Sequence, residues 1–413
     1  MEHWALQGKK IVLGVSGGIA AYKAVELLRL FVKAGASVQC IMTEAATRFV
    51  APLTFEALSG RPVPIGVFTS PGESGGIDHI QVAQQADLVV VAPATANSLA
   101  KFSGGFASDM LSAVLLATKA PVLLAPGMNV EMWNNPATKH NLEILRSRGM
   151  AVVGPEPGDL ACGVVGMGRM SEPLHVFDAA VDLVAPNWLD GRKILVTAGP
   201  TREALDGVRF LSNRSSGKMG YALARVAAAL GAEVRLLSGP TCLPDPWGVQ
   251  VSRVESAAQM AEAVFSWMDW AEVIVKAAAV ADFRPSAPLD GKLDKTEAGA
   301  NWHLELTANP DILWQLGRRR HGSRPVLVGF AAEMGGDWEA RARAKMDRKG
   351  CDHIVVNDVS LADRGFEAES NAAVLLSRDG GRREFELMPK EHLAMRLWNV
   401  LSREIESRRE VDG

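Results

Sequence analysis

Short aliphatic runs alternate with longer amphipathic stretches along the chain, and two of these runs open in the same way. Residues 10–15 and 193–197 are aliphatic or β-branched, and each leads into a glycine loop and then a helical pattern. After the first helix, the next strand is expected at 37–42. A strand, a glycine loop, a helix and a second strand form a βαβ unit. Such units place parallel strands in a sheet that helices cover on both faces.

Further aliphatic runs extend this alternation through both halves of the chain. They predict additional strands at 86–92, 121–125, 151–153, 232–238, 273–275, 326–329 and 353–356. The expected fold class is therefore α/β, with two doubly wound, Rossmann-like domains. A stretch punctuated by proline and glycine, 183–191, separates the halves, and we place the domains at 1–187 and 188–413. The motifs around the two openings differ, which argues against an internal duplication.

Composition narrows the class of protein. The 413 residues are 48% hydrophobic and 22% charged with a net charge of −3, which excludes a disordered chain. The mildly acidic balance argues against nucleic acid as the main partner. No apolar stretch approaches the roughly 18 residues of a membrane span, so we expect a cytoplasmic protein without a membrane partner. The four cysteines form no CxxC pair, which leaves neither a zinc site nor a disulfide framework.

Neither glycine loop is a dinucleotide fingerprint. Residues 14–18 do not read GxGxxG, and 198–201 depart further, which argues against a Rossmann dehydrogenase. A P-loop is also absent, because Ser212 stands where its first glycine belongs and Met219 follows Lys218. A glycine loop before a helix can bind phosphate through backbone N–H groups, or it can simply form a tight turn. Both interpretations stay open at each loop.

Three residues in the first half are candidates for chemistry. Asn129 follows the strand 122–125, where ligands sit in parallel sheets, so it either binds a ligand or caps the next helix. His79 has a structural and a catalytic interpretation. Cys162 lies in the glycine-rich stretch 158–168, which is typical of a mobile flap.

Four motifs in this half together carry a resemblance to a family. They are SGGIAAYK at 16–23, APATAN at 92–97, PGMNVEMW at 126–133 and ACG at 161–163. In this order, across 9–185, they resemble the homo-oligomeric flavin-containing cysteine decarboxylases. The resemblance implies that this half binds FMN and decarboxylates 4′-phosphopantothenoylcysteine.

The resemblance also implies residue roles. Oxidising the substrate's CH₂–SH group to a thioaldehyde provides an electron sink for CO₂ loss, which is why a flavin is needed. His79 would act as base in the oxidation and decarboxylation, Asn129 would grip the carboxylate, and Cys162 would protonate the enethiolate. No role is carried onto Asn97 or Lys101. The implied FMN contacts are Ser16, Gly17, Gly18, Thr43, Ala94, Thr95 and Met128.

The second half presents another set of polar motifs. Polar side chains and glycines at 212–220 precede an amphipathic helix, which makes a phosphate pocket credible. Lys345 and Lys349 lie one helical turn apart, so they either reach a triphosphate or form a solvated basic face. SNRSSGKMG at 212–220, AAVAD at 278–282, NPDI at 309–312 and GFAAE at 329–333 resemble the bacterial CTP-using phosphopantothenate–cysteine ligases.

This second resemblance, over 192 to about 400, implies an acyl-cytidylate intermediate, with Mg²⁺ and lysines neutralising phosphate charge. Asn213 and Arg209 would hold the acyl-cytidylate, and Lys292 would serve the attack of the cysteine amine. Asp282 is a possible Mg²⁺ ligand. The implied nucleotide contacts are Lys276, Ala277, Ala278, Asp282, Lys292, Pro310, Asp311, Ile312, Leu313, Phe330, Lys345 and Lys349.

Two positions depart from the ligase pattern. Asp294 interrupts the lysine-rich loop at 292–295, and Arg214 stands where a histidine is common. The two halves together resemble the fused enzymes that make 4′-phosphopantetheine from 4′-phosphopantothenate, L-cysteine and CTP. Decarboxylase trimers assembled into a dodecamer, and ligase dimers, are implied as well. The alternative is a flavoprotein module that has lost catalysis, and the presence of His79, Asn129 and Cys162 argues against it.

Overall fold

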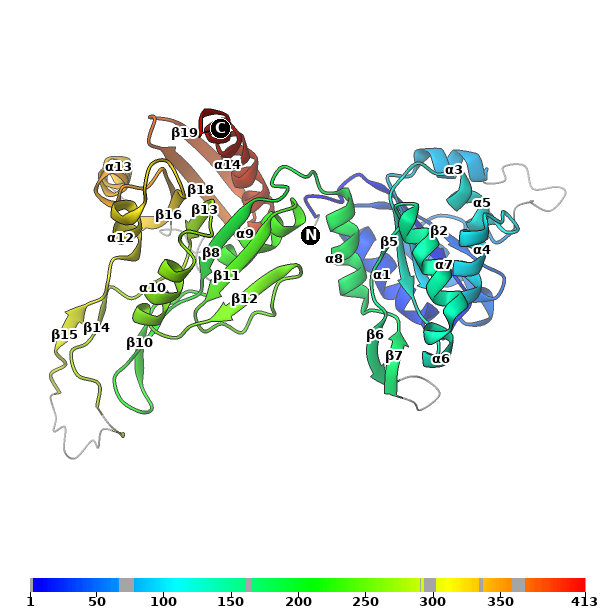
Figure 1. Cartoon of the computed structure of the whole chain (residues 1–413), viewed down its shortest axis with the longest axis horizontal. Coiled ribbons are helices and arrows are strands. Elements are labelled where there is room, and N and C mark those ends of the chain that lie inside the picture. The colour runs from blue at the N-terminus through cyan, green and yellow to red at the C-terminus, as the bar shows by residue number, and fades with distance from the viewer. Residues whose placement is uncertain are drawn as a thin grey trace. The chain divides into compact units, whose positions relative to one another are not determined.

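The computed structural model describes residues 3–66, 78–159, 165–289, 291–292, 302–333, 337–358 and 368–412. The chain separates into two compact units, Met1–Ala185 and Pro186–Gly413. Each unit has a central, mainly parallel sheet with helices on both faces (Figure 1). The predicted fold class, two doubly wound α/β domains, is therefore confirmed.

The N-terminal sheet is entirely parallel, with strand order β2-β1-β3-β4-β5. Side chains on one face form a core with helices α3, α4, α5 and α7, while α1 and α8 pack together on the other. The strands are β1 (Lys10–Val15), β2 (Ser37–Met42), β3 (Leu88–Ala94), β4 (Val122–Pro126) and β5 (Ala151–Val152). The helices are α1 (Ala21–Lys33), α2 (Pro52–Ser59), α3 (His79–Gln85), α4 (Ala96–Gly104), α5 (Met110–Ala117), α6 (Val130–Asn134), α7 (Pro136–Ser147) and α8 (Pro173–Val184).

An antiparallel hairpin precedes α8 in this unit. It pairs β6 (Glu156–Asp159) with β7 (Val165–Arg169). Its closing residues, which include Cys162, lie outside the described part of the chain.

The C-terminal sheet has eight strands in the order β12-β11-β8-β13-β16-β17-β18-β19, of which the first six are parallel. Those six follow the 3-2-1-4-5-6 order of the doubly wound nucleotide-binding fold. The strands are β8 (Lys193–Ala198), β11 (Glu233–Ser238), β12 (Val249–Arg253), β13 (Val273–Lys276), β16 (Val326–Glu333), β17 (His353–Asp358), β18 (Ser370–Ser377) and β19 (Arg382–Pro389).

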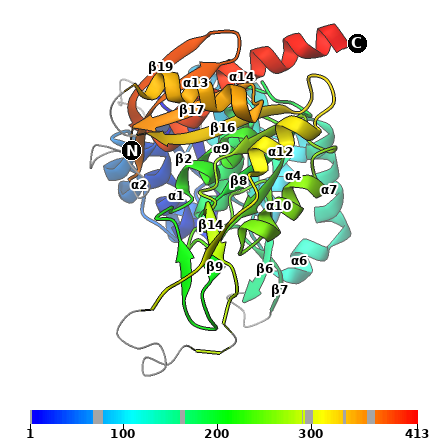
Figure 2. The same ribbon diagram turned by 90° about the vertical axis from the view of Figure 1, so that its left-hand side faces the viewer.

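Helices cover both faces of this sheet as well. Helices α10 (Ala257–Ser266), α12 (Ile312–Arg319) and α13 (Trp338–Lys349) share one core, and α9 (Lys218–Ala229) packs with α14 (Lys390–Asp412). Two short antiparallel strand pairs extend away from the sheet (Figure 2). The first pairs β9 (Arg202–Ala204) with β10 (Phe210–Ser212), and the second pairs β14 (Phe283–Pro285) with β15 (Leu306–Ala308).

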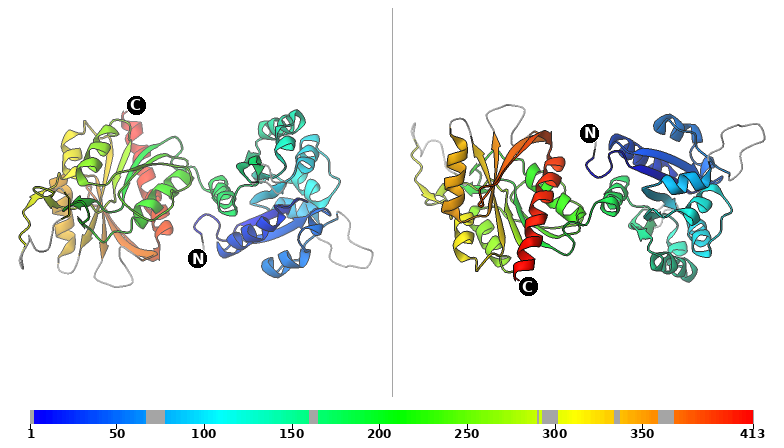
Figure 3. Two further views of the ribbon diagram at one scale, coloured as in Figure 1. Left: turned by 90° about the horizontal axis from the view of Figure 1, so that it is seen from below. Right: turned by 90° about the horizontal axis from the view of Figure 1, so that it is seen from above.

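Helix α14, red in Figure 3, packs on α9 and on strands β18 and β19 of the sheet. The fully buried Trp398 donates its indole N–H to the carbonyl of Leu223 on α9 at 2.9 Å. This contact anchors α14, whose first residue is Lys390. No helix in the described ranges has both the length and the apolar character of a membrane span.

Candidate active sites

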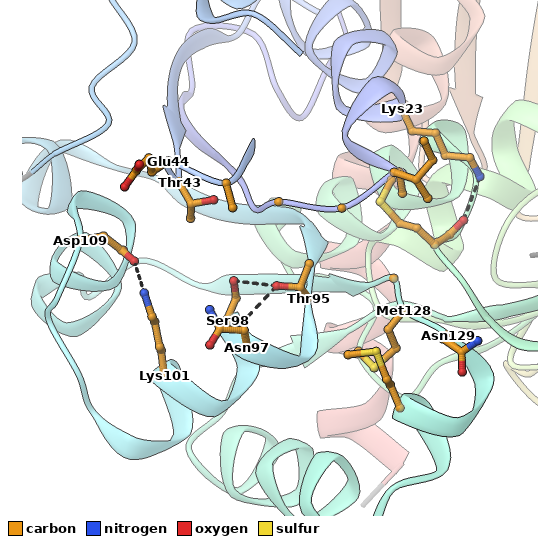
Figure 4. A pocket seen from close by; sticks show the side chains of 18 of the residues that line it. Lys23, Thr43, Glu44, Thr95, Asn97, Ser98, Lys101, Asp109, Met128 and Asn129 are labelled. Carbon is orange, nitrogen blue, oxygen red and sulfur yellow. Dashed lines mark hydrogen bonds and ion pairs between the residues drawn. The ribbon is translucent and has the colours of Figure 1, made fainter. Parts of the chain in front are cut away.

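A large cavity opens at the carboxyl edge of the N-terminal sheet. Its volume is about 1290 Å³. Loops after β1, β2, β3 and β4 contribute to it, and β1 and β3 are the strands at which the order of the sheet reverses. Ligands of open α/β sheets bind at this position. The polar and glycine residues lining it include Gly17, Gly18, Lys23, Thr43, Glu44, Thr95, Asn97, Ser98, Lys101, Ser108, Asp109, Asn129 and Arg169 (Figure 4).

The loop after β1 is held against the end of β3. The Ser16 hydroxyl donates to the carbonyl of Pro93 at 2.7 Å and accepts from the amide of Thr95 at 3.0 Å. A Cβ on Gly17 would lie 2.4 Å from the Cβ of Ala45, so only glycine fits there. No side chain caps the N-terminus of α1, which begins just after this loop. The loop and helix start therefore suit a phosphate group.

Lys23 ties α1 to the end of β7. Its side chain is 6% exposed, and its ammonium donates to the carbonyl of Met170 at 2.9 Å (Figure 4). The same ammonium lies 3.2 Å from the Glu172 carboxylate. Burial acts to raise the pKa of Glu172, but the charges of Lys23 and Arg169 lower it overall. One wall of the cavity is thus fixed by a buried cation.

Asn129 both caps a helix and lines the cavity. Its side-chain oxygen accepts from the amide of Glu131 at 2.8 Å at the start of α6. Figure 4 places Asn129 beside Met128, well apart from Lys101 and Asp109, whose charged groups lie 2.7 Å apart. The two interpretations of Asn129 are therefore compatible.

The structure brings together most of the predicted flavin contacts, but not the predicted catalytic set. Gly17, Gly18, Thr43, Thr95 and Met128 line the cavity, while Ser16 and Ala94 are buried and do not line it. His79 begins α3, with its Nδ1 3.6 Å from the Asp78 carboxylate, and does not line this cavity. Within the described part of one chain, His79 and Asn129 are not brought to one site.

A smaller cavity, of about 150 Å³, lies at the carboxyl edge of the C-terminal sheet. The start of α9 and the ends of β13, β16 and β17 surround it, next to the β8/β13 reversal of strand order. Its lining residues are Ser215, Gly217, Lys218, Met219, Gly220, Ala277, Ala278, Ala279, Phe330, Ala331, Ala332, Asn357, Asn371 and Lys390. Of the predicted nucleotide contacts, Ala277, Ala278 and Phe330 belong to this set.

Other predicted nucleotide contacts form a separate cluster at the start of α12. The Lys349 ammonium lies 3.3 Å from the Asp311 carboxylate. The buried Lys276 has its ammonium 3.7 Å from the sulfur of Met260. Burial, reinforced by the Lys349 charge, lowers the pKa of Lys276 from 10.5 to about 7. Pro310 precedes this helix start, Ile312 and Leu313 are its first residues, and Lys345 lies one turn before Lys349 on α13.

The predicted catalytic residues of this unit do not line the cavity, and two of them, Arg209 and Asn213, flank strand β10. The side-chain amide of Asn213 donates to the carbonyl of Ala279, a lining residue, at 3.0 Å. The Arg209 guanidinium pairs with the buried Asp206 carboxylate, Nε to Oδ2 at 2.9 Å. The amide of Gly207 donates to the carbonyl of Gly291 at 2.8 Å, which places Lys292 beside the Arg209 loop.

The described residues contain no group of three histidine, cysteine or acidic side chains that could hold a metal ion. Asp282, the possible Mg²⁺ ligand, is exposed, and its backbone carbonyl accepts from the amide of Asn309 at 2.8 Å. Mg²⁺ commonly binds through one carboxylate together with substrate phosphates, and the single carboxylate of Asp282 fits that mode. Asp294 lies outside the described residues.

Comparisons with known proteins define the class of the chain. The flavoprotein family matches residues 2–185, and the DNA/pantothenate metabolism flavoprotein C-terminal domain matches 189–405. The N-terminal unit therefore matches the flavoprotein family, and the C-terminal unit matches a domain that occurs in pantothenate metabolism proteins.

Full-length relatives define the family more narrowly. The coenzyme A biosynthesis bifunctional protein CoaBC of Vibrio cholerae is 45% identical over 96% of this chain and 98% of its own length. Its counterpart in Mycobacterium tuberculosis is 48% identical over 95% of this chain and 96% of its own length. A solved C-terminal domain of a CoaBC protein is 40% identical and covers 53% of this chain and all of its own, with a TM-score of 0.45. The chain belongs to the family of bifunctional coenzyme A biosynthesis proteins.

Replacing Lys23 by methionine tests the buried cation of the N-terminal cavity. Lys23→Met leaves the buried carbonyl of Met170 without its donor, which should lower the unfolding free energy of this unit by about 1–3 kcal/mol. Urea titration followed by bound-flavin fluorescence measures the loss. Lys33→Met, an exposed lysine on the same helix, is the matched control. Equal losses of unfolding free energy in Lys23→Met and Lys33→Met would contradict the stabilising role of the Lys23 ammonium.

Lys276 predicts a pH dependence of stability. Below pH 7 its ammonium is charged in both states, so the cost of burying it is fully present. Between about pH 7 and 10.5 only the unfolded chain holds the proton, so stability rises with pH. Lys276→Met should therefore be more stable than the wild type at pH 6. That advantage should shrink by up to about 1.4 kcal/mol per pH unit above pH 7. Calorimetry from pH 6 to 9 checks this, and an unchanging gap would refute it.

Proposed function

We propose that the chain catalyses two consecutive steps, with 4′-phosphopantothenoylcysteine made in the C-terminal unit and decarboxylated in the N-terminal unit. The observation that carries the proposal is the position of the two cavities. Each lies where the strand order of its sheet reverses, and each is lined by residues of the motifs that carry the family resemblance.

In the ligase step, a carboxylate oxygen of 4′-phosphopantothenate attacks the α-phosphorus of CTP and pyrophosphate leaves. The cysteine amine then attacks the acyl carbon and CMP leaves. Asn213 and Arg209 hold the acyl-cytidylate, and Lys292, on the neighbouring loop, serves the amine attack. Mg²⁺, bound by the nucleotide phosphates and Asp282, would neutralise negative charge there. The Asp206 carboxylate beside Arg209 keeps the guanidinium oriented.

In the decarboxylase step, the neutral amide of Asn129 binds the substrate carboxylate while its oxygen stays on the cap of α6. His79 accepts a proton, and Cys162 returns one to the product. Bound FMN supplies the electron acceptor and donor that the thiol carbon requires. The cavity fits this group, because its 1290 Å³ exceeds the roughly 300–1,000 Å³ of ordinary ligand pockets and leaves room for substrate as well.

The position of His79 is the reason for proposing a homo-oligomer. Because His79 does not line the cavity of its own chain, a neighbouring copy would have to bring it to Asn129. A site shared in this way requires at least two copies, and we propose that they form decarboxylase trimers assembled into a dodecamer, together with dimers of the ligase unit. The cytoplasm remains our prediction for the compartment.

Two variants should separate the activities. With CTP, Mg²⁺, cysteine and 4′-phosphopantothenate, His79→Asn should accumulate 4′-phosphopantothenoylcysteine, because a lost general base costs about 10²–10⁴ in rate. Lys292→Gln should release little CMP yet convert added 4′-phosphopantothenoylcysteine at the wild-type rate. Mass spectrometry of the products measures both.

Lys193 is an exposed lysine at the amino end of β8, whereas the cavity lies at the carboxyl edge of the sheet. Lys193→Gln therefore serves as the control and should retain both activities. The assignment of one activity to each unit would be contradicted if His79→Asn slowed the ligase step, or if Lys292→Gln slowed decarboxylation.

A further inference from the structure

Among the described residues that line the small C-terminal cavity, two are charged, and both are lysines. Lys218 is the first residue of α9, and Lys390 is the first residue of α14. None of the described lining residues is acidic. Gly217, just before α9, has a φ of 79° and provides no side-chain cap. Two helix N-termini therefore add their positive ends to two ammonium groups at one cavity.

The two lysines are close enough to affect each other. Lys390 is 6% exposed, and its ammonium donates to the carbonyl of Ala368. Burial, and then the charge of Lys218, lower the pKa of Lys390 to about 8. The Lys218 ammonium pairs with the exposed carboxylate of Glu369. Two like charges beside one small cavity favour an anionic ligand that carries more than one negative charge.

Asn357 adds a requirement for a hydrogen-bond donor. It lies in β17 and lines the cavity, and its buried side-chain oxygen has no donor among the described residues. The cavity volume of 150 Å³ is below that of a pocket for a whole drug-sized ligand. A ligand that carries several phosphates and also hydroxyl or amino groups would supply both the negative charge for the lysines and the donor for Asn357. The small volume means that only part of such a ligand would enter the cavity.

We propose that Lys218 and Lys390 bind the β- and γ-phosphates of the nucleotide, so that helix α14 supplies a binding residue for the leaving pyrophosphate. This rests on the proposed use of CTP in the C-terminal unit. When a carboxylate oxygen bonds to the α-phosphorus, the bond to the bridging oxygen breaks and its electron pair stays on pyrophosphate. The two ammonium groups neutralise that charge, and the phosphates compete with Glu369 for Lys218.

The test compares CTP with CMP, which lacks the two outer phosphates. Isothermal titration calorimetry with Mg²⁺ should show Lys390→Gln binding CTP about 10- to 100-fold more weakly, with CMP affinity changed less than about twofold. Lys390→Arg should restore most of the CTP affinity. The exposed Lys193→Gln, at the amino end of β8, is the matched control and should bind both nucleotides normally.

A proton readout separates phosphate binding from a merely structural role. At pH 8.5 the wild type should take up protons when it binds CTP, because an anion raises the pKa of Lys390, and Lys390→Gln should take up fewer. Titrations in buffers of different ionisation enthalpy measure this uptake.

Equal losses for CTP and CMP, an unchanged CTP affinity, or the same proton uptake in Lys390→Gln would each overturn the assignment. Failure of the wild type to bind either nucleotide would instead refute the proposed use of CTP.

Discussion

Parallel pairing makes the strands of a sheet end at one edge, and the loops that follow them meet there. In the N-terminal unit this edge gathers Gly17 from the loop after β1, Thr95 from the loop after β3 and Met128 from the loop after β4. In the C-terminal unit it gathers the start of α9 and the loop 277–279. At each reversal of strand order neighbouring loops diverge, which leaves space for a ligand. Both candidate sites depend on this constraint.

Buried lysines recur at these edges. Lys23, Lys276 and Lys390 are all less than 10% exposed, and removing an ammonium group from water is costly. Each has a different neighbour: a carbonyl and a carboxylate for Lys23, a sulfur and a second lysine for Lys276, and a carbonyl for Lys390. The charge of Lys349 acts on Lys276 and that of Lys218 acts on Lys390, which is expected at a site that binds an anion.

The elements that could be predicted from the sequence are those buried on both faces. The runs that became β3, β4, β13 and β16 are almost entirely apolar, so their composition identifies them. The hairpin β9/β10 and the edge strand β12 were not predicted, because they are short or partly exposed and carry mixed side chains.

The site could be predicted where residues directly follow strands or belong to quoted motifs, as Gly17, Thr95 and Ala277 do. Lys23, Lys218 and Lys390 received no role, because their positions depend on tertiary contacts. Lys23 reaches Met170, which lies 147 residues away, and Lys390 depends on the packing of α14 against α9. For Lys218 the sequence did offer a signal of a binding role, because the residue lies in the motif at 212–220 and at the expected start of a helix.

The central claim, that one chain makes and then decarboxylates 4′-phosphopantothenoylcysteine, is tested most directly with the wild-type protein. A single incubation with Mg²⁺, CTP, 4′-phosphopantothenate and cysteine is followed by mass spectrometry over time. The account predicts 4′-phosphopantetheine with equal amounts of CMP, pyrophosphate and CO₂, and a transient intermediate. Release of CMP without CO₂, or no reaction with CTP while added 4′-phosphopantothenoylcysteine is also left unchanged, would contradict it.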